Sequence, residues 1–203
     1  MLGNHMMPDL TKTTTTLLEG LFDQQNTQAW LVFNNRFFPM IVAYARRRGI
    51  QEADAEDIAQ ETLIDFAKAY RDGKYDRERG RLRHWLGGIA SHRISKHLAR
   101  RGRGPHVITG EGKSAILHGA VGGDQGPDQW EQEWERHMLE LCKAQIRAEF
   151  SERVYEAFEQ YAVNGRPADE VAEEFRITRN TLYISKSRIL TRMREIRSML
   201  EDE

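Results

Sequence analysis

The sequence predicts an all-α protein of two small helical domains joined by a flexible linker, with a helix-turn-helix in the C-terminal domain. Apolar residues recur at helical spacing along most of the chain, and no segment shows the strict apolar–polar alternation that is typical of a strand. Residues 104–128 interrupt this pattern with seven glycines and two prolines. Charge is segregated into basic and acidic blocks, although the formal net charge of the 203 residues is only −1.

The N-terminal half predicts a tail and two helices. Residues 1–25 are expected to form a flexible tail, because their beginning is polar and threonine-rich and lacks the apolar core of a signal peptide. Residues 28–48 carry an apolar helical stripe, which Pro39 is expected to kink or split. Residues 54–70 predict a second helix, with carboxylates in the first turn, where the helix dipole favours them.

A polar loop and a basic helix follow. The loop covers residues 71–83 and contains two glycines, and the helix covers residues 82–101 and ends in arginines. Residues 104–128 hold few large apolar side chains, so they cannot bury enough surface to offset their ordering entropy. They are therefore expected to be a linker between domains.

The C-terminal half predicts four helices. Apolar positions indicate a helix over residues 130–146 and another over residues 154–161, which Asn164 and Gly165 stop. The short helix 167–175 and the longer helix 179–199 come after them.

The last two helices, with the tight link between them, predict the helix-turn-helix. Pro167 suits the start of the first helix and Thr178 is a good N-cap for the second. The second helix is expected to bury Leu182, Ile189, Met193 and Ile196. Arginine and asparagine suit base edges, whereas lysine, serine and threonine suit phosphates. A helical hairpin with a charged, solvated face is the alternative reading.

Two basic blocks predict two separate contacts with a polyanion. Residues 71–103 carry a net charge of +8 and residues 176–197 a net charge of +6, whereas residues 128–174 carry −8. Solvated helix faces are the alternative explanation for either block alone. The single cysteine, Cys142, can form no internal disulfide and builds no zinc site alone, which favours a reducing cytoplasm.

Two stretches resemble a known family. Ala53-Asp-Ala-Glu-Asp-Ile-Ala-Gln-Glu-Thr-Leu63 and Tyr75-Asp-Arg-Glu-Arg-Gly-Arg-Leu-Arg-His-Trp-Leu-Gly-Gly-Ile-Ala90 resemble region 2 of RNA polymerase sigma factors. Residues 155–194 resemble region 4 of the same family. The order of the two regions and the tether between them are similar to the extracytoplasmic-function group of the sigma-70 family. The resemblance implies a region 2 over residues 26–103 and a region 4 over residues 129–203.

The resemblance also implies residue roles. Region 2 would bind core RNA polymerase through the acidic helix, with Asp54, Glu56, Asp57, Gln60 and Glu61. It would melt and read the −10 promoter element with Tyr75, Arg77, Arg81, Arg83, His84, His92, Arg93, Lys96, Arg100 and Arg101. Region 4 would read the −35 element with Arg176, Thr178, Arg179, Asn180, Thr181, Tyr183, Lys186, Ser187 and Arg188.

The chain departs from the family pattern at several positions. His92 stands where asparagine is common, Lys96 where aspartate is common, and Ser185 where a basic residue is common. The link from Phe175 to Thr178 lacks the usual turn glycine. These departures leave open the base preferred at the −10 element and the geometry of the turn.

The expected function is that of a sigma factor that directs promoter-specific transcription initiation. Its expected partners are core RNA polymerase and promoter DNA in the cytoplasm, with no membrane insertion; the sequence leaves open whether an anti-sigma factor binds it. A stand-alone helix-turn-helix repressor or activator is the alternative. An enzyme is not expected, because no nucleophile, phosphate-loop or zinc-protease motif is present, and no cofactor or metal is expected either.

Overall fold

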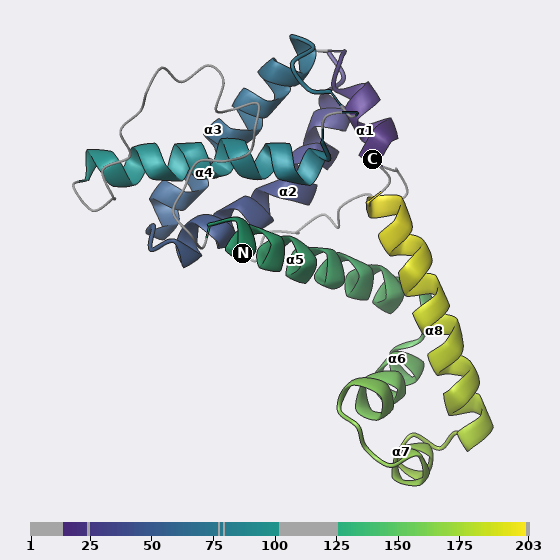
Figure 1. Ribbon diagram of the computed structural model, residues 1–203. Coiled ribbons are helices and arrows are strands. Elements are labelled where there is room, and N and C mark those ends of the chain that lie inside the picture. Colours follow the sequence, from purple (N-terminus) through teal and green to yellow (C-terminus); the bar gives the residue numbers. More distant parts are fainter. Residues whose placement is uncertain (1–13, 24, 77, 79, 102–125, 202–203) are drawn as a thin grey trace, which may run out of the picture. The chain divides into compact units, whose positions relative to one another are not determined.

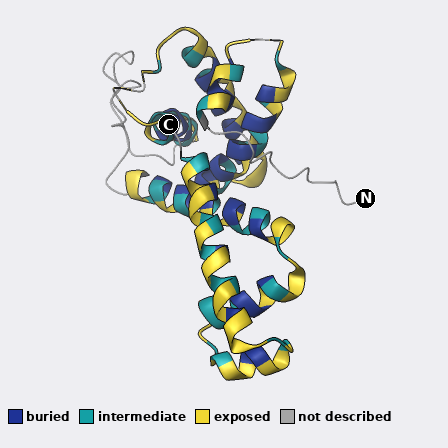
Figure 2. Cartoon of the chain, turned by 90° about the vertical axis from the view of Figure 1, so that its right-hand side faces the viewer, coloured by how far each residue is buried: buried dark blue, intermediate teal, exposed yellow. Residues whose placement is uncertain are grey.

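The computed structural model describes residues 14–23, 25–76, 78, 80–101 and 126–201, and all regular structure in these ranges is helical (Figure 1). This confirms the all-α prediction. Residue contacts divide the chain into two units, Met1–His137 with Glu203, and Met138–Asp202. Each unit has its own buried side chains, drawn in dark blue in Figure 2.

Within the described residues, unit 1 contains four helices and the beginning of a fifth. These are α1 (Thr14–Gly20), α2 (Thr27–Arg47), α3 (Glu52–Arg71), α4 (Leu82–Arg100) and the first half of α5 (Gly126–Glu149). Helix α2 packs against α3, and α3 packs against α4. The sequence-predicted helices therefore exist, with ends that differ by one or two residues for α2, α3 and α4.

Pro39 was expected to kink or split its helix. It does not split the helix, because α2 continues across this residue. The helix begins at an N-cap, since the side chain of Asn26 accepts a hydrogen bond of 3.0 Å from the backbone N–H of Ala29. Phe37, two residues before Pro39, and Met40, directly after it, are each 1% exposed. Their burial holds the helix together across the hydrogen bond that proline cannot donate.

The expectation of a flexible tail over residues 1–25 is wrong for residues 14–21. Residues 14–20 form α1, and Leu17, Leu18 and Leu21 are buried. Helix α1 packs on α2, where the ideal Cβ of an alanine at Gly20 would lie 2.8 Å from Ala29. Burial of three leucines stabilises this short helix despite the threonine-rich sequence before it.

The core of unit 1 is aromatic. Phe33 stacks on Phe66 with ring centroids 4.9 Å apart, and Phe37 stacks on Trp134 at 5.8 Å. Helices α2, α3 and α5 thus contribute to one buried cluster, in which all four rings are at most 1% exposed.

Helix α5 belongs to unit 1 as far as His137, whereas the sequence reading begins the second domain at residue 129. Trp130 and Trp134 explain this difference, because both indoles are buried and contact α2, and the indole of Trp130 also contacts α4. Glu133 is 2% exposed and forms an ion pair with Arg47 of α2. Residues 126–128 of the expected linker lie in α5. The rest of the linker, residues 104–125, lies outside the described residues.

Unit 2 consists of the second half of α5, the helices α6 (Glu152–Phe158), α7 (Ala168–Glu174) and α8 (Arg179–Leu200), and the π-helical segment Glu159–Val163. Its core contains Ala157, Val171 and Leu182, with Tyr161, Ala168, Phe175 and Ile177 packed against them. Gly165 follows the π-helical segment with φ +71°, a left-handed conformation that suits glycine. Leu182, Ile189 and Ile196 are buried as predicted, whereas Met193 is only half-buried.

Candidate nucleic-acid interface

The predicted polymerase-binding residues share one helix. Glu56, Asp57, Gln60 and Glu61 are exposed on α3, while Ala55, Ile58 and Ala59 face the core. Asp54 is half-buried. The structure therefore brings these five side chains together on α3, four of them open to solvent.

Two of these carboxylates are already paired with cations of the predicted DNA-binding set. Arg93 of α4 donates to Glu61 at 2.6 Å and forms a second ion pair with Asp65. Arg101 lies 2.9 Å from Asp54. Positive charge on α4 is thus partly neutralised by α3.

Other exposed basic side chains lie along and before α4. Arg81 is the exposed N-cap residue, and His84, Lys96 and Arg100 are exposed on the helix. His92 is half-buried. Arg77 lies outside the described residues.

Arg83 occupies a different place from the other predicted cations. Its guanidinium pairs with Glu131 at 3.1 Å, and its backbone carbonyl accepts a hydrogen bond of 2.9 Å from Nε1 of Trp130. Arg83 therefore contributes to the attachment of α5 to unit 1.

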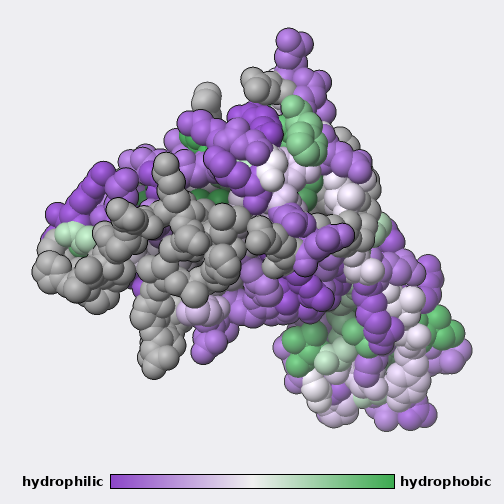
Figure 3. Space-filling view, turned by 45° about the horizontal axis from the view of Figure 1, so that its top comes forward, coloured by the Kyte–Doolittle hydropathy of each residue, from purple (hydrophilic) through white to green (hydrophobic). Residues whose placement is uncertain are grey.

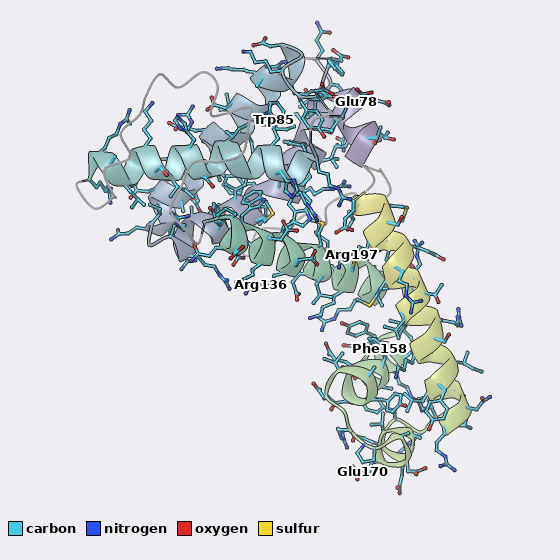
Figure 4. The ribbon with its side chains drawn as sticks, viewed as in Figure 1. Glu78, Trp85, Arg136, Phe158, Glu170 and Arg197 are labelled. Atoms are coloured by element: carbon cyan, nitrogen blue, oxygen red, sulfur yellow. The ribbon has the colours of Figure 1, made fainter. Side chains whose placement is uncertain are left out.

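An aromatic stack stands beside the start of α4, where Figure 4 labels Trp85. Tyr75, from the loop after α3, stacks on Trp85 of α4 with centroids 4.9 Å apart and an interplanar angle of 22°. The ring centroids of Tyr70 and Tyr75 lie 6.0 Å apart. Burial, and to a smaller extent the charge of Glu19, raises the pKa of the Tyr70 phenol. Trp85 is not among the residues predicted to bind DNA, yet its side chain is only half-buried. Half-exposed aromatic rings next to cations can stack with unpaired nucleobases.

In unit 2, helices α7 and α8 are joined by the tight turn Phe175–Thr178. Thr178 caps α8, since its Oγ1 accepts a hydrogen bond of 3.0 Å from the backbone N–H of Thr181. Arg176 has φ +49°, so it takes the left-handed conformation, which favours glycine over residues with a side chain.

Arg153 of α6, which the sequence analysis did not single out, holds this turn. Its Nε donates to the carbonyl oxygen of Phe175 at 2.6 Å, and its Nη2 donates to that of Arg176 at 2.7 Å. No local sequence signal could identify it, because the residues that it contacts lie more than twenty positions away. These bonds satisfy carbonyls at the C-terminal end of α7.

The beginning of α8 presents the predicted −35 side chains to solvent. Arg179, Asn180, Tyr183, Ser187 and Arg188 are exposed, as are Thr178 and Thr181 of the cap and Arg176 of the turn. Lys186 is half-buried, and its ammonium lies 4.9 Å from the ring centroid of Tyr161. Arg179 pairs with Asp169 of α7 at 3.1 Å. All nine residues thus lie on the turn or the first half of α8.

The described residues also bear on metal binding and on membrane insertion. These ranges hold no group of three or more histidine, cysteine or acidic side chains that could bind a metal ion. No helix in the same ranges is long and apolar enough to cross a membrane. Cys142 is buried, and this burial raises the pKa of its thiol, so the thiol is a packing group.

Comparison with known proteins addresses the first unit. Residues 35–104 match the family model "Sigma-70 region 2". This range covers most of α2, all of α3 and α4, and the aromatic stack between them. No curated protein matches the chain. Residues 35–104, about a third of the chain, are thus similar to sigma-70 region 2, and the match supports a relationship of this part of the chain to RNA polymerase sigma factors.

Proposed function

We propose that the chain is a sigma factor that binds core RNA polymerase and directs it to specific promoters, as members of the extracytoplasmic-function group do. The observation that carries this proposal is the sigma-70 region 2 match, which includes both the exposed acidic face of α3 and the Tyr75–Trp85 stack. A stand-alone DNA-binding regulator has no need for that region.

The acidic face of α3 is proposed to dock on polymerase. Glu56, Asp57 and Gln60 are exposed and form no ion pair that competes with a partner among the described residues. A basic surface on polymerase would complement them and speed the encounter. Glu61 would contribute only after its pair with Arg93 opens, or together with Arg93 as a pair.

The −10 element is proposed to be melted and read between the loop before α4 and α4 itself. Opening a duplex requires a surface that accepts unstacked bases, because unpairing costs a few kcal/mol. The Tyr75–Trp85 stack offers such a surface. The exposed side chains of Arg81 and His84 lie at the start of α4, where they can contact the phosphate backbone of the DNA.

The −35 element is proposed to be read by α7 and α8 acting as a helix-turn-helix. The first turns of α8 would enter the major groove, where Arg179 and Asn180 reach base edges. The pair between Arg179 and Asp169 would have to open or reorient for this contact. Both side chains are exposed, so the cost of opening is small.

Run-off transcription tests the proposal directly. The full chain is added to core polymerase, and transcripts are mapped on a genomic DNA library. Defined start sites that share −35 and −10 sequences, and that vanish without the chain, are the expected result. Operator-like binding by the isolated chain with no new transcripts would refute the proposal.

A further inference from the structure

Ile184 is an exposed apolar side chain on the helix proposed to read DNA. It is 51% exposed, and its neighbour Tyr183 is 47% exposed. Tyr183 has a packing partner, since its ring lies 5.7 Å from that of Tyr161. The core side of α8 is formed by Leu182, Ile189 and Ile196, each 0% exposed. The packing of unit 2 therefore does not explain an isoleucine at position 184.

Helix geometry places Ile184 at the middle of the outward face. At 3.6 residues per turn, position 184 lies about 200° around the axis from Leu182 and thus faces away from the core. The same geometry puts Asn180, Ser187 and Thr191 within about 60° of Ile184. All three are exposed. Ile184 is thus surrounded by side chains that can donate hydrogen bonds to a duplex.

The charge around Ile184 fits a polyanion. No acidic residue occurs from Arg179 to Arg194, and Arg188, one turn after Ile184, is exposed. Figure 3 shows apolar areas, in green, on the surface of unit 2 among hydrophilic residues, in purple. An exposed apolar group within a cationic, hydrogen-bonding face is suited to an apolar feature on a ligand that is otherwise anionic.

In the major groove, the base edges offer one such feature, the C5 methyl group of thymine. We propose that Ile184 packs against the methyl group of a thymine in the −35 element and so determines base preference at that position. This inference rests on the proposed function, because it requires α8 to enter the major groove. The alternative occupant is a protein surface, and the test below separates the two.

Replacement of thymine by deoxyuridine tests the contact, since it removes the methyl group and leaves every hydrogen bond in place. The −35 sequence is first selected from randomised duplexes by the full chain bound to core polymerase. Each thymine is then replaced singly, and binding to this holoenzyme is measured. We expect one replacement to weaken binding roughly three- to fivefold, the value of burying one methyl group.

Variants identify the side chain. Ile184→Ala should weaken binding to the thymine duplex by a similar or larger factor and should no longer distinguish thymine from deoxyuridine at that position. Val163→Ala is the matched control, because Val163 is an apolar residue of the same unit, 62% exposed, outside α8. It should keep the full response to deoxyuridine.

Four results overturn the inference. A selected −35 element without thymine, or an Ile184→Ala variant that still discriminates against deoxyuridine, refutes the methyl contact while the proposed function stands. Weakened binding of Ile184→Ala to core polymerase in the absence of DNA would assign the side chain to a protein contact instead. Failure of the holoenzyme to select any −35 sequence would refute the proposed function itself.

Discussion

The guanidinium of Arg153 and the backbone of Arg176 are joined by a hydrogen bond of 2.7 Å from Nη2 to the carbonyl oxygen. Among the non-glycine residues that the structure describes, only Arg176 has a positive φ, at +49°. A left-handed conformation costs an ordinary residue about 1–2 kcal/mol. The bonds from Arg153 help to compensate for this cost, so the turn before α8 depends on a residue of α6.

The first prediction concerns this pair. Arg153→Ala should lower the free energy of unfolding of unit 2 by about 1 kcal/mol, because two charge-assisted hydrogen bonds at an exposed site are lost. Arg176→Gly should raise it by about 0.5–1 kcal/mol, because glycine adopts positive φ without strain. Thermal unfolding followed by circular dichroism measures both effects.

Hydrogen exchange locates the effect of Arg153. The amides of residues 175–178 should exchange faster in Arg153→Ala, and Arg153→Lys should recover only part of the protection, since an ammonium cannot reach both carbonyls with the same geometry. Unchanged exchange in this turn would contradict the role assigned to Arg153.

The second prediction concerns the contact between α4 and α5. A Cβ at Gly87 would lie 2.7 Å from Nε1 and 2.8 Å from Cε2 of Trp130. Gly87→Ala should therefore destabilise unit 1 by about 1–3 kcal/mol, although alanine normally favours a helix over glycine by about 1 kcal/mol. Chemical denaturation followed by tryptophan fluorescence measures the change.

Gly80→Ala is the control for this prediction, because nothing lies within 4 Å of its ideal Cβ. It should leave stability nearly unchanged. A Gly87→Ala variant that is as stable as the wild type would mean that Trp130 does not pack on α4 as described.

The third prediction concerns polymerase binding. Glu61→Lys should weaken binding of the chain to core polymerase several-fold, because it reverses a charge on the proposed docking face and breaks the pair with Arg93. Glu52→Lys is a matched control, since Glu52 also lies on α3 and pairs with an arginine, Arg46, at 3.1 Å. Affinity is measured by fluorescence titration at fixed salt.

A double variant separates the two consequences. Glu61→Lys with Arg93→Glu restores an ion pair between α3 and α4 but leaves the charge on α3 reversed. Recovery of polymerase binding in the double variant would show that the pair, and not the docking charge, matters.

The fourth prediction concerns pH and the pair between Glu149 and Arg192. Arg192 donates to both carboxylate oxygens of Glu149, at 2.7 and 2.9 Å, and these bonds lower the pKa of Glu149 below its ordinary 4.5. The stabilisation is therefore present in full above about pH 5 and is lost as the pH falls through the lowered pKa. The melting temperature of Glu149→Gln should lie below that of the wild type at pH 7, and the difference should shrink towards pH 3. A difference that is independent of pH would contradict this assignment.

Local patterns predicted most helices, because apolar periodicity reports which face of a helix is buried. Helix α8 shows this well, since Leu182, Ile189 and Ile196 follow one stripe and are buried. Helix α1 was missed because threonines dominate that segment, although the spacing of Leu17, Leu18 and Leu21 carries the same signal.

Long-range contacts could not be predicted from the sequence. The pair of Glu61 with Arg93, and the bond from Arg153 to Arg176, join residues 32 and 23 positions apart. Trp130 and Trp134 were expected in the C-terminal domain, and nothing local shows that they pack on α2 and α4. The roles predicted for single residues therefore depended on the resemblance to a known family, whereas the contacts between distant residues became visible only in the structure.

The two units are proposed to act on different states of the promoter, and permanganate reactivity of thymines around the −10 element measures this directly. Holoenzyme is formed with the wild type, with Tyr75→Ala or with Arg179→Ala, on duplex and on premelted templates. Tyr75→Ala should bind duplex nearly normally, give reduced reactivity, and be at least partly rescued by premelting. Arg179→Ala should lose roughly ten- to a hundredfold in first binding, as expected for one bidentate base contact, without rescue by premelting. An equal response of both variants to premelting, or tight duplex binding by the isolated chain, would contradict the account.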